Sequence, residues 1–137
     1  MIDQLTVLLT NRPGALKSMV DVLARAQVQI HALSIDDSAD FGIVRFICDK
    51  PDHAMDQLRK TGFTASTTKV LAVEVSNVPG GLAAILSRLA SVELNIMYAY
   101  TCSVEGRTVD IIRVAGDPVN VKLAQAHLPQ LTQEDLS

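Results

Sequence analysis

The stretch "TNRPGALKSM", Thr10–Met19, recurs later in the chain as "SNVPGGLAAI", Ser76–Ile85. Each copy places N-x-P-G-x-L between an apolar, strand-like run and a helix-like pattern. When Leu5–Ile30 is laid over Leu71–Ile96, nine of the 26 positions are identical. The chain of 137 residues therefore contains an internal repeat, and such a repeat predicts a repeated supersecondary structure.

The repeat continues beyond these stretches. "RFICD", Arg45–Asp49, corresponds to "RVAGD", Arg113–Asp117, at a larger offset than the first stretches have. We therefore expect two additional residues in the hairpin before the third strand of the second copy. The two arginines should then occupy equivalent places in mid-strand. Each is expected on the open sheet face or paired with the aspartate of its own segment, and an interface ion pair or a carboxylate clamp is the functional alternative.

Each copy predicts the same series of elements. Apolar positions three and four residues apart indicate a helix after each N-x-P-G turn. These positions are Leu16, Met19, Val20 and Leu23, and Leu82, Ile85, Leu86 and Leu89. A second helix is expected from Pro51 to a stop at Gly62, and its counterpart begins near Pro118. The expected strands are Leu5–Thr10, Ile30–Asp36, Ile43–Cys48 and Phe63–Thr67, and Leu71–Ser76, Ile96–Cys102, Val109–Ala115 and Pro129–Thr132.

The resulting order is β-α-β-β-α-β, twice. Right-handed crossovers with both helices on one face of the sheet produce a ferredoxin-like sandwich. We therefore predict an α+β protein with two such sandwiches in tandem, one from residues 1–68 and the other from residues 69–137. The antiparallel sheets are expected to pair edge to edge, which protects an exposed strand edge in each.

Composition and charge exclude several classes of protein. The formal net charge of −3 provides no basic surface for nucleic acid. No apolar run approaches the roughly 20 residues that span a bilayer, and the N-terminus lacks the basic and cleavage segments of a signal peptide. We expect a cytoplasmic protein that binds neither nucleic acid nor a membrane.

The residues that usually carry catalysis or hold metals are not arranged for it. Cys48 and Cys102 lie in strand-like stretches and are expected to be free buried thiols, with a disulfide or redox role as the alternative. The three histidines have no metal-ligand spacing, so no metal or other cofactor is expected. No nucleophile–base pattern or placed carboxylate pair is present, so we do not expect an enzyme.

The repeated turn offers a place for an anion. At a helix start several N–H groups lack an intrahelical acceptor, and the helix dipole adds about half a positive charge. Gly14 and Gly80 allow a ligand to approach the backbone. Asn11 and Asn77 are candidate caps with a proline in the first helical turn, and their amides suit an amino group beside a carboxylate. The alternative is that N-x-P-G is only an efficient cap and turn.

These residues carry a resemblance to a known family. "LTVLLTNRPGALKSMVDVLARAQVQI" and "LAVEVSNVPGGLAAILSRLASVELNI", each followed by a hairpin and a helix, resemble the ACT domain, a small regulatory module. The resemblance covers nearly the whole chain as two tandem ACT domains. It implies amino-acid binding in the loop after the first strand and the start of the first helix. In that family the second strand of a neighbouring domain closes the site.

Carried over by position, the resemblance assigns two sets of ligand-binding residues. The loop residues are Asn11, Arg12, Pro13, Gly14, Ala15 and Leu16, and Asn77, Val78, Pro79, Gly80, Gly81 and Leu82. The second-strand residues are His31, Leu33, Ser34 and Ile35, and Met97, Tyr98, Tyr100 and Thr101.

The chain departs from the family pattern after the first helix of each copy. The family often has glycine there, whereas this chain has Gln27 and Glu93. A positive φ at a residue other than glycine costs about 1 kcal/mol. Gln29 also replaces the asparagine that the second copy keeps as Asn95, which weakens the resemblance in the first copy.

The two copies differ in the expected second strand. We expect Ile96, Tyr98 and Tyr100 to share one face, and Ile30, Ala32 and Ser34 to share the matching face of the first copy. The larger side chains would make the two sites unequal in size and affinity. The alternative is that both tyrosines are core or interface residues.

The sequence therefore predicts a regulatory protein that binds a small molecule, most simply an amino acid. Because no catalytic domain is attached, it would act in trans on an unidentified enzyme or through a homodimer. An assembly module with vestigial ligand sites is the alternative, and a small ferredoxin-like enzyme is disfavoured by the missing catalytic groups.

Overall fold

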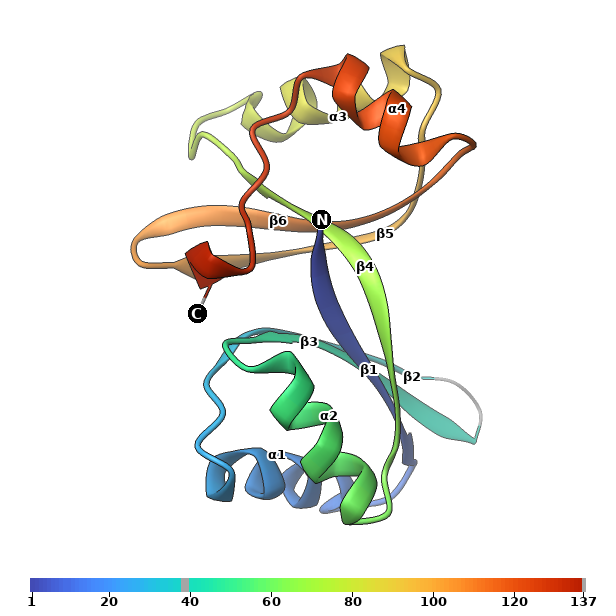
Figure 1. Cartoon of the computed structure of the whole chain (residues 1–137), viewed down its shortest axis with the longest axis vertical. Helices are drawn as coiled ribbons and strands as arrows, with labels where there is room; N and C mark the ends of the chain where they lie inside the picture. Colours follow the sequence, from blue (N-terminus) through green and yellow to red (C-terminus); the bar gives the residue numbers. More distant parts are fainter. Residues whose placement is uncertain (38–39, 137) are drawn as a thin grey trace. The chain divides into compact units, whose positions relative to one another are not determined.

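The computed structural model describes residues 1–37 and 40–136 (Figure 1). The first copy contains β1 (Ile2–Thr10), α1 (Ala15–Arg25), β2 (Ile30–Asp37), β3 (Phe41–Cys48), α2 (Pro51–Lys60) and β4 (Thr64–Glu74). The second contains α3 (Gly81–Ser91), β5 (Asn95–Val104), β6 (Arg107–Ala115), α4 (Val119–Ala126) and the short 3-10 helix η1 (Glu134–Leu136). The predicted tandem of ferredoxin-like units is confirmed.

The chain divides into two compact units. The N-terminal unit comprises Asp3–Lys69 together with Leu136, and the C-terminal unit comprises Met1–Ile2 and Val70–Asp135. Strand β4 contributes to both, since it is continuous where two separate strands were expected. The strands form a six-stranded sheet in the hydrogen-bonded order β2-β3-β1-β4-β6-β5.

The last expected strand, Pro129–Thr132, forms only an isolated bridge. Gln130 pairs with Val73 of β4, and the Leu131 N–H donates to the Ala72 carbonyl at 2.8 Å. Prolines mark the start of the second helix in each copy, as expected. Pro51 is the first residue of α2, and α4 begins directly after Pro118. A proline tolerates these positions because its missing N–H has no acceptor there.

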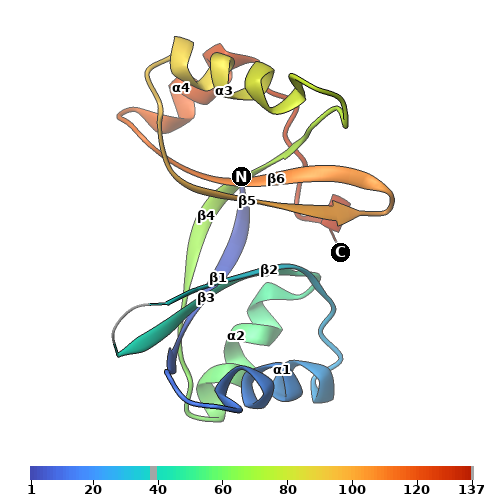
Figure 2. The same cartoon turned by 180° about the vertical axis from the view of Figure 1, so that it is seen from behind.

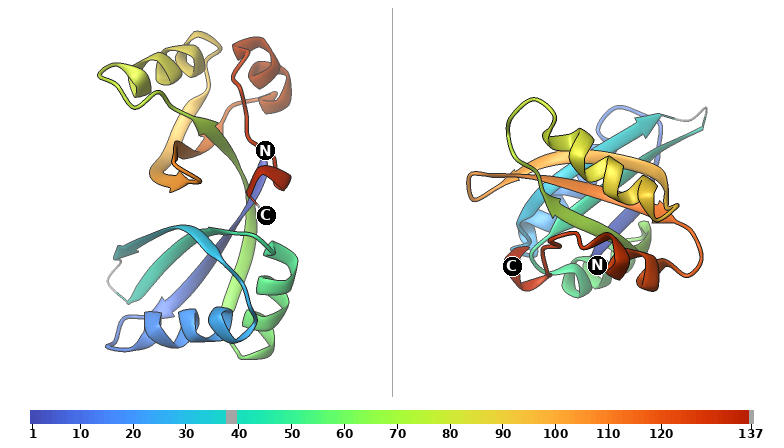
Figure 3. Two further views of the ribbon diagram at one scale, coloured as in Figure 1. Left: turned by 90° about the vertical axis from the view of Figure 1, so that its left-hand side faces the viewer. Right: turned by 90° about the horizontal axis from the view of Figure 1, so that it is seen from above.

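The N-terminal unit packs α1 and α2 side by side on one face of its sheet (Figures 1 and 3). Met19 and Leu23 on α1 are fully buried, as the helical pattern predicts, whereas Leu16 and Val20 are half-buried at the margin of the same core. Leu58 on α2 and Phe46 on β3 complete the centre of this core. Such apolar burial is the main stabilising contribution to the unit.

The C-terminal unit has the same construction. Helices α3 and α4 lie on one side of β5 and β6 (Figure 2). Ile85 and Leu89 on α3 are buried against Leu71 on β4 and Ile112 on β6. Both cores are therefore mostly aliphatic, as the low aromatic content of 4% predicts.

The structure corrects the predicted faces of β2 and β5. Strand register shifts between Ile30 and Ala32, and between Ile96 and Tyr98. Residues directly opposite in an antiparallel pair share a face. Ile96 pairs with Val114 of the core, whereas Tyr98 pairs with Arg113 on the opposite face. A β-bulge inserts one residue, so it moves the tyrosines away from the face of Ile96.

The same displacement occurs in the first copy. Ile30 pairs with the core residue Cys48, whereas Ser34 pairs with Arg45 on the face away from the helices. Ala32 pairs with Ile47 and shares that second face with Ser34. The predicted common face of Ile30 with Ala32 and Ser34 is therefore wrong for the same reason.

The strand register also corrects the offset of the third strand. Leu5 pairs with Phe46, and its counterpart Leu71 pairs with Ile112, so the two pairs enclose equal lengths of chain. The hairpin of the second copy therefore has no additional residues, and the length difference follows β6. Arg45 corresponds to Ile111 rather than to Arg113. Arg45 forms an ion pair with Asp36, not with Asp49.

Candidate functional site

A glycine in the left-handed conformation precedes the first helix of each unit. Gly14 has φ 84° and Gly80 has φ 87°, and each is the N-cap of its helix. A glycine adopts this conformation without the steric penalty of a side chain. Helix α1 begins at Ala15 and has no side-chain cap, so the predicted capping roles of Asn11 and Asn77 are wrong. The prolines precede the glycines and therefore lie before the helices, not in their first turns.

The start of α1 leaves N–H groups available. The Ala15 N–H donates to the Arg12 carbonyl at 3.3 Å, and the Ser18 N–H donates to the Gly14 carbonyl at 3.0 Å. Within residues 1–37 and 40–136, the N–H groups of Leu16 and Lys17 have no recorded acceptor. Donors of this kind at a helix N-terminus attract anionic groups.

Two polar side chains near this turn are already engaged. The Asn11 amide donates one N–H from Nδ2 to Asp37 Oδ1 at 3.3 Å, which leaves its second N–H and its Oδ1 available. The Ser18 hydroxyl donates to the Gly14 carbonyl at 3.0 Å. These bonds tie the turn to β2 and to the next turn of α1.

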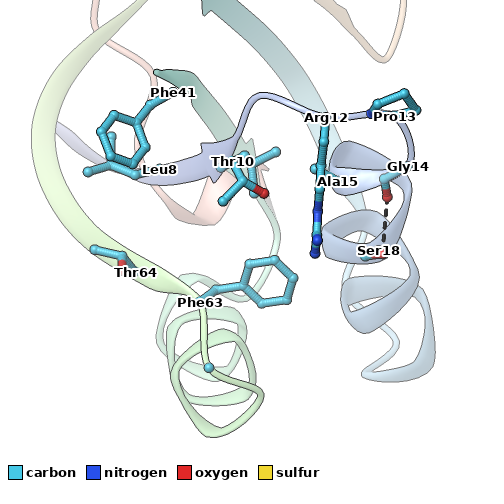
Figure 4. A pocket seen from close by; sticks show the side chains of 12 residues that line it. Leu8, Thr10, Arg12, Pro13, Gly14, Ala15, Ser18, Phe41, Phe63 and Thr64 are labelled. Carbon is cyan, nitrogen blue, oxygen red and sulfur yellow. Dashed lines mark hydrogen bonds between the residues drawn. The ribbon is translucent and has the colours of Figure 1, made fainter. Parts of the chain in front are cut away.

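A pocket of about 690 Å³ opens beside this turn in the N-terminal unit (Figure 4). Its size lies within the range of small-molecule sites. It is bounded by the end of β1, the following loop, the start of α1, the first residue of β3 and the connection from α2 to β4. The lining residues are Leu8, Leu9, Thr10, Arg12, Pro13, Gly14, Ala15, Ser18, Phe41, Gly62, Phe63 and Thr64.

Arg12 provides the charge of this pocket. Its side chain runs along the start of α1, and the Phe63 ring points toward it (Figure 4). Its backbone is hydrogen-bonded within the turn, but among the described residues the Arg12 guanidinium has no hydrogen-bond or ion-pair partner. An unengaged guanidinium provides forked donors that match a carboxylate.

The structure brings together only part of the predicted first site. Arg12, Pro13, Gly14 and Ala15 line the pocket, whereas Asn11 and Leu16 do not. Of the residues predicted from the second strand, His31, Leu33, Ser34 and Ile35 do not line it either.

Sequence reasoning missed the aromatic wall of the pocket. Phe41 is 47% exposed, and Phe63 is half-buried at the edge of the core. The protein has three phenylalanines, and these two are pocket residues. Phenylalanine is rare in this chain, which was the available signal, but the separate positions of Phe41 and Phe63 gave no indication that they line one pocket.

The second loop is packed differently. A Cβ atom at Gly81 would lie 2.1 Å from the Ser76 carbonyl oxygen, so only glycine fits there. Ala15 occupies the corresponding place in the first loop. Val78 is 62% exposed, and Leu82 is also exposed. Asn77, Pro79 and Gly80 are exposed in the same turn.

The predicted residues on β5 serve in part to support the C-terminal unit. Thr101 donates from its hydroxyl to Asp110 Oδ1 at 2.9 Å, and Asp110 is only 4% exposed. Asp110 Oδ2 is buried without a hydrogen-bond partner among the described residues. Met97 is exposed at the bulge, and Tyr98 and Tyr100 are half-buried on the face away from the helices.

His31 and the cysteines have structural surroundings. His31 Nε2 is hydrogen-bonded to the Leu136 carbonyl, which attaches the C-terminal turn to the N-terminal unit. Both cysteines are free thiols. Burial raises the pKa of Cys48 to about 11 and also raises the pKa of Cys102, so neither is an activated thiolate.

Across the part of the chain that the structure describes, no three metal-ligating side chains gather in one place. Within the same residues, the helices are all too short or too polar to traverse a bilayer.

A family model described as an ACT domain pair matches residues 1–135. The chain belongs to the ACT domain pair family. Its match spans both units, which agrees with the twofold βαββα order and with the paired N-x-P-G turns.

Solved structures agree with this assignment. This ACT domain pair is 32% identical to protein BT0572 from Bacteroides thetaiotaomicron, with a TM-score of 0.88 over 98% of this chain and 94% of that chain. It is 15% identical to the ligand-free regulatory subunit of aspartate kinase from Thermus thermophilus, with a TM-score of 0.64 over 91% and 90% of the two chains. The second likeness shows a shared fold. A search among curated protein sequences found no match.

Proposed function

We propose that this ACT domain pair is a ligand-binding regulatory protein whose N-terminal unit binds an amino acid. The observation that carries the proposal is the pocket of about 690 Å³ that adjoins the Asn11–Leu16 turn. Membership of the ACT domain pair family supports a regulatory role, and the similar fold of an aspartate kinase regulatory subunit is consistent with it.

The ligand carboxylate would be held by Arg12 and by the available N–H groups of α1. Asn11 lies beside the pocket and not in its lining, so its Oδ1 would add only a peripheral contact to the ligand amine. The family resemblance adds the second strand of a facing domain as a wall for the ligand side chain. Binding between two domains would couple them, provided that the ligand has different affinities for two arrangements.

The output of such a protein would be exerted in trans. A regulated enzyme or a second copy of the chain would respond to the ligand. We place this activity in the cytoplasm and expect a homodimer.

A screen of the twenty amino acids by thermal unfolding tests this proposal. A ligand that binds only the folded state raises the unfolding midpoint. We expect selective stabilisation by one amino acid or by a few related ones, its loss in Arg12→Gln, and only a small change in Asn11→Ala. No stabilisation by any amino acid would contradict amino-acid binding.

A second candidate function is an assembly module. The compact turn at Gly81 and the exposed apolar side chains of Val78 and Leu82 favour a contact surface over a ligand site in the second loop. Sedimentation measurements with and without amino acids separate the two functions, because an assembly module would oligomerise equally in both conditions.

A further inference from the structure

The chemistry of the N-terminal pocket narrows the ligand beyond an amino acid in general. We infer that the pocket selects a carboxylate carried on a large apolar body, with an aromatic ring as the best fit, and that an α-amino group contributes little. This inference rests on the proposed function, because it concerns the same pocket.

The size of the pocket disfavours small ligands. At about 30 Å³ for each water molecule, about 690 Å³ corresponds to roughly 20 waters. Glycine or serine would leave most of this space hydrated, with the apolar walls still in contact with water. A ligand that carries a ring displaces that water and buries apolar surface, and this burial contributes favourably to the free energy of binding.

The walls are suited to a ring. Phe41 and Phe63 come from separate elements, β3 and the connection from α2 to β4, and Leu8 and Leu9 contribute from β1. Aromatic pairs gain energy beyond the area that they bury when they stack offset or edge to face. Phe41 is 47% exposed in the ligand-free protein, so it retains apolar surface for a ligand to cover.

The charge of the pocket has one sign. Among the described residues that line it, Arg12 alone carries a formal charge, and the others are apolar or neutral. A carboxylate therefore has a counter-charge in the pocket, whereas an ammonium group has none. An amine without a carboxylate would be opposed by Arg12.

The second unit provides an internal comparison, since the strand registers of the two units match. At the positions of Arg12, Phe41 and Leu8 it has Val78, Arg107 and Glu74. The cation, the ring and the apolar wall are all replaced there. The selectivity that we infer therefore belongs to the N-terminal unit alone.

Calorimetric titration of the full chain with four probes tests the inference: phenylalanine, 3-phenylpropanoate, 2-phenylethylamine and serine. We expect phenylalanine and 3-phenylpropanoate to bind with affinities within about tenfold of each other. The amine and serine should bind at least tenfold more weakly than either. Arg12→Gln should weaken the two aromatic carboxylates by about tenfold or more, the usual loss for a hydrogen bond to a charged group. Lys60→Gln, which removes an exposed charge of the same unit outside the pocket lining, should not.

Phe41→Ala is the second variant, because Phe41 is exposed and its removal leaves the core intact. It should weaken the aromatic carboxylates while the unfolding midpoint of the free protein stays unchanged. Binding of serine or another small polar amino acid in preference to phenylalanine would overturn the inference and leave the proposed function standing. Binding of the amine as tightly as of the carboxylates would also overturn it. Failure of every amino acid and carboxylate to bind would overturn both.

Discussion

Asp110 is a buried carboxylate at a place where the first unit has an apolar side chain. By the strand register it corresponds to Val44, which is fully buried in the N-terminal core. Thr101 satisfies Oδ1 of Asp110, whereas Oδ2 has no partner among the described residues. A buried acceptor without a donor is destabilising, so this position lowers the stability of the C-terminal unit.

Asp110→Val should therefore stabilise the C-terminal unit. Removing the unsatisfied oxygen while filling the site as in the first unit should raise the free energy of unfolding by about 1–3 kcal/mol. Urea unfolding followed by circular dichroism measures the change. Thr101→Val is the opposite control: it removes the donor to Oδ1 and keeps the buried carboxylate, so it should lower the free energy of unfolding by about 1–3 kcal/mol. A lower stability of Asp110→Val would show that Asp110 is needed for the fold.

Gln27 and Glu93 illustrate what residue-level reasoning can predict. The resemblance to the ACT domain indicated that a glycine is missing at each place and that a positive φ there would be strained, and both residues do adopt φ 59°. By contrast, the Asn11 and Asn77 caps were wrong, because Gly14 and Gly80 take the N-cap positions. A backbone conformation that favours one residue type is visible in a sequence, whereas the choice between two neighbouring cap positions depends on local geometry.

Gln27→Gly and Glu93→Gly should each stabilise the protein by about 0.5–1 kcal/mol, because glycine removes the strain of the left-handed conformation. The greater freedom of the unfolded chain offsets part of that gain. Differential scanning calorimetry of both variants measures the effect. Ala24→Gly, inside α1, is the control and should destabilise the protein by about 1 kcal/mol. Destabilisation by both test variants would contradict the account of strain.

The helices and strands could be predicted from the sequence more fully than the register in which the strands pair. Apolar periodicity located all four helices in the described chain and seven of the eight expected strand segments, two of which form the continuous β4. It could do so because burial imposes a period of 3.6 or 2 on the sequence. The bulges at His31 and Met97 could not be predicted, since one inserted residue leaves no compositional trace. The bulge separates the tyrosines of β5 from the face of Ile96. The equivalent bulge in β2 separates Ala32 and Ser34 from Ile30, so the predicted difference in side-chain size lies on the face away from the helices.

The two N-x-P-G turns are also unequal as elements. The first borders a pocket, and the second brings the Ser76 carbonyl against Gly81. The two turns therefore have similar sequences but pack differently. The residues that differ are Arg12 against Val78 and Ala15 against Gly81. They distinguish the proposed ligand site from the compact second turn.

Gly81→Ala should destabilise the C-terminal unit by about 1–3 kcal/mol, because the new methyl group would overlap the Ser76 carbonyl. The matched control is Ala15→Gly in the first loop, which should cost no more than about 1 kcal/mol through helix propensity. Thermal unfolding of the two variants measures the difference. Equal small effects would show that the second turn relaxes freely and is no more compact than the first.

At the scale of the whole molecule, the protein is an ACT domain pair with two units of one fold and different chemistry. Family and fold could be recognised from the repeat because the same order of elements occurs twice. The complete pocket could not be predicted, because Phe41, Phe63 and Arg12 lie far apart in the sequence and line one pocket only in the folded chain. The pairing of a ligand pocket in one unit with a compact turn in the other is the central feature of the proposed regulation.

The most direct test of this account is a titration of the isotope-labelled protein with its best-stabilising ligand, followed by NMR chemical shifts of the backbone amides. Binding in the first pocket predicts the largest shifts at Arg12–Ser18, Phe41 and Gly62–Thr64, with small shifts at Asn77–Leu82. The largest shifts at Asn77–Leu82, or at neither loop, would contradict it.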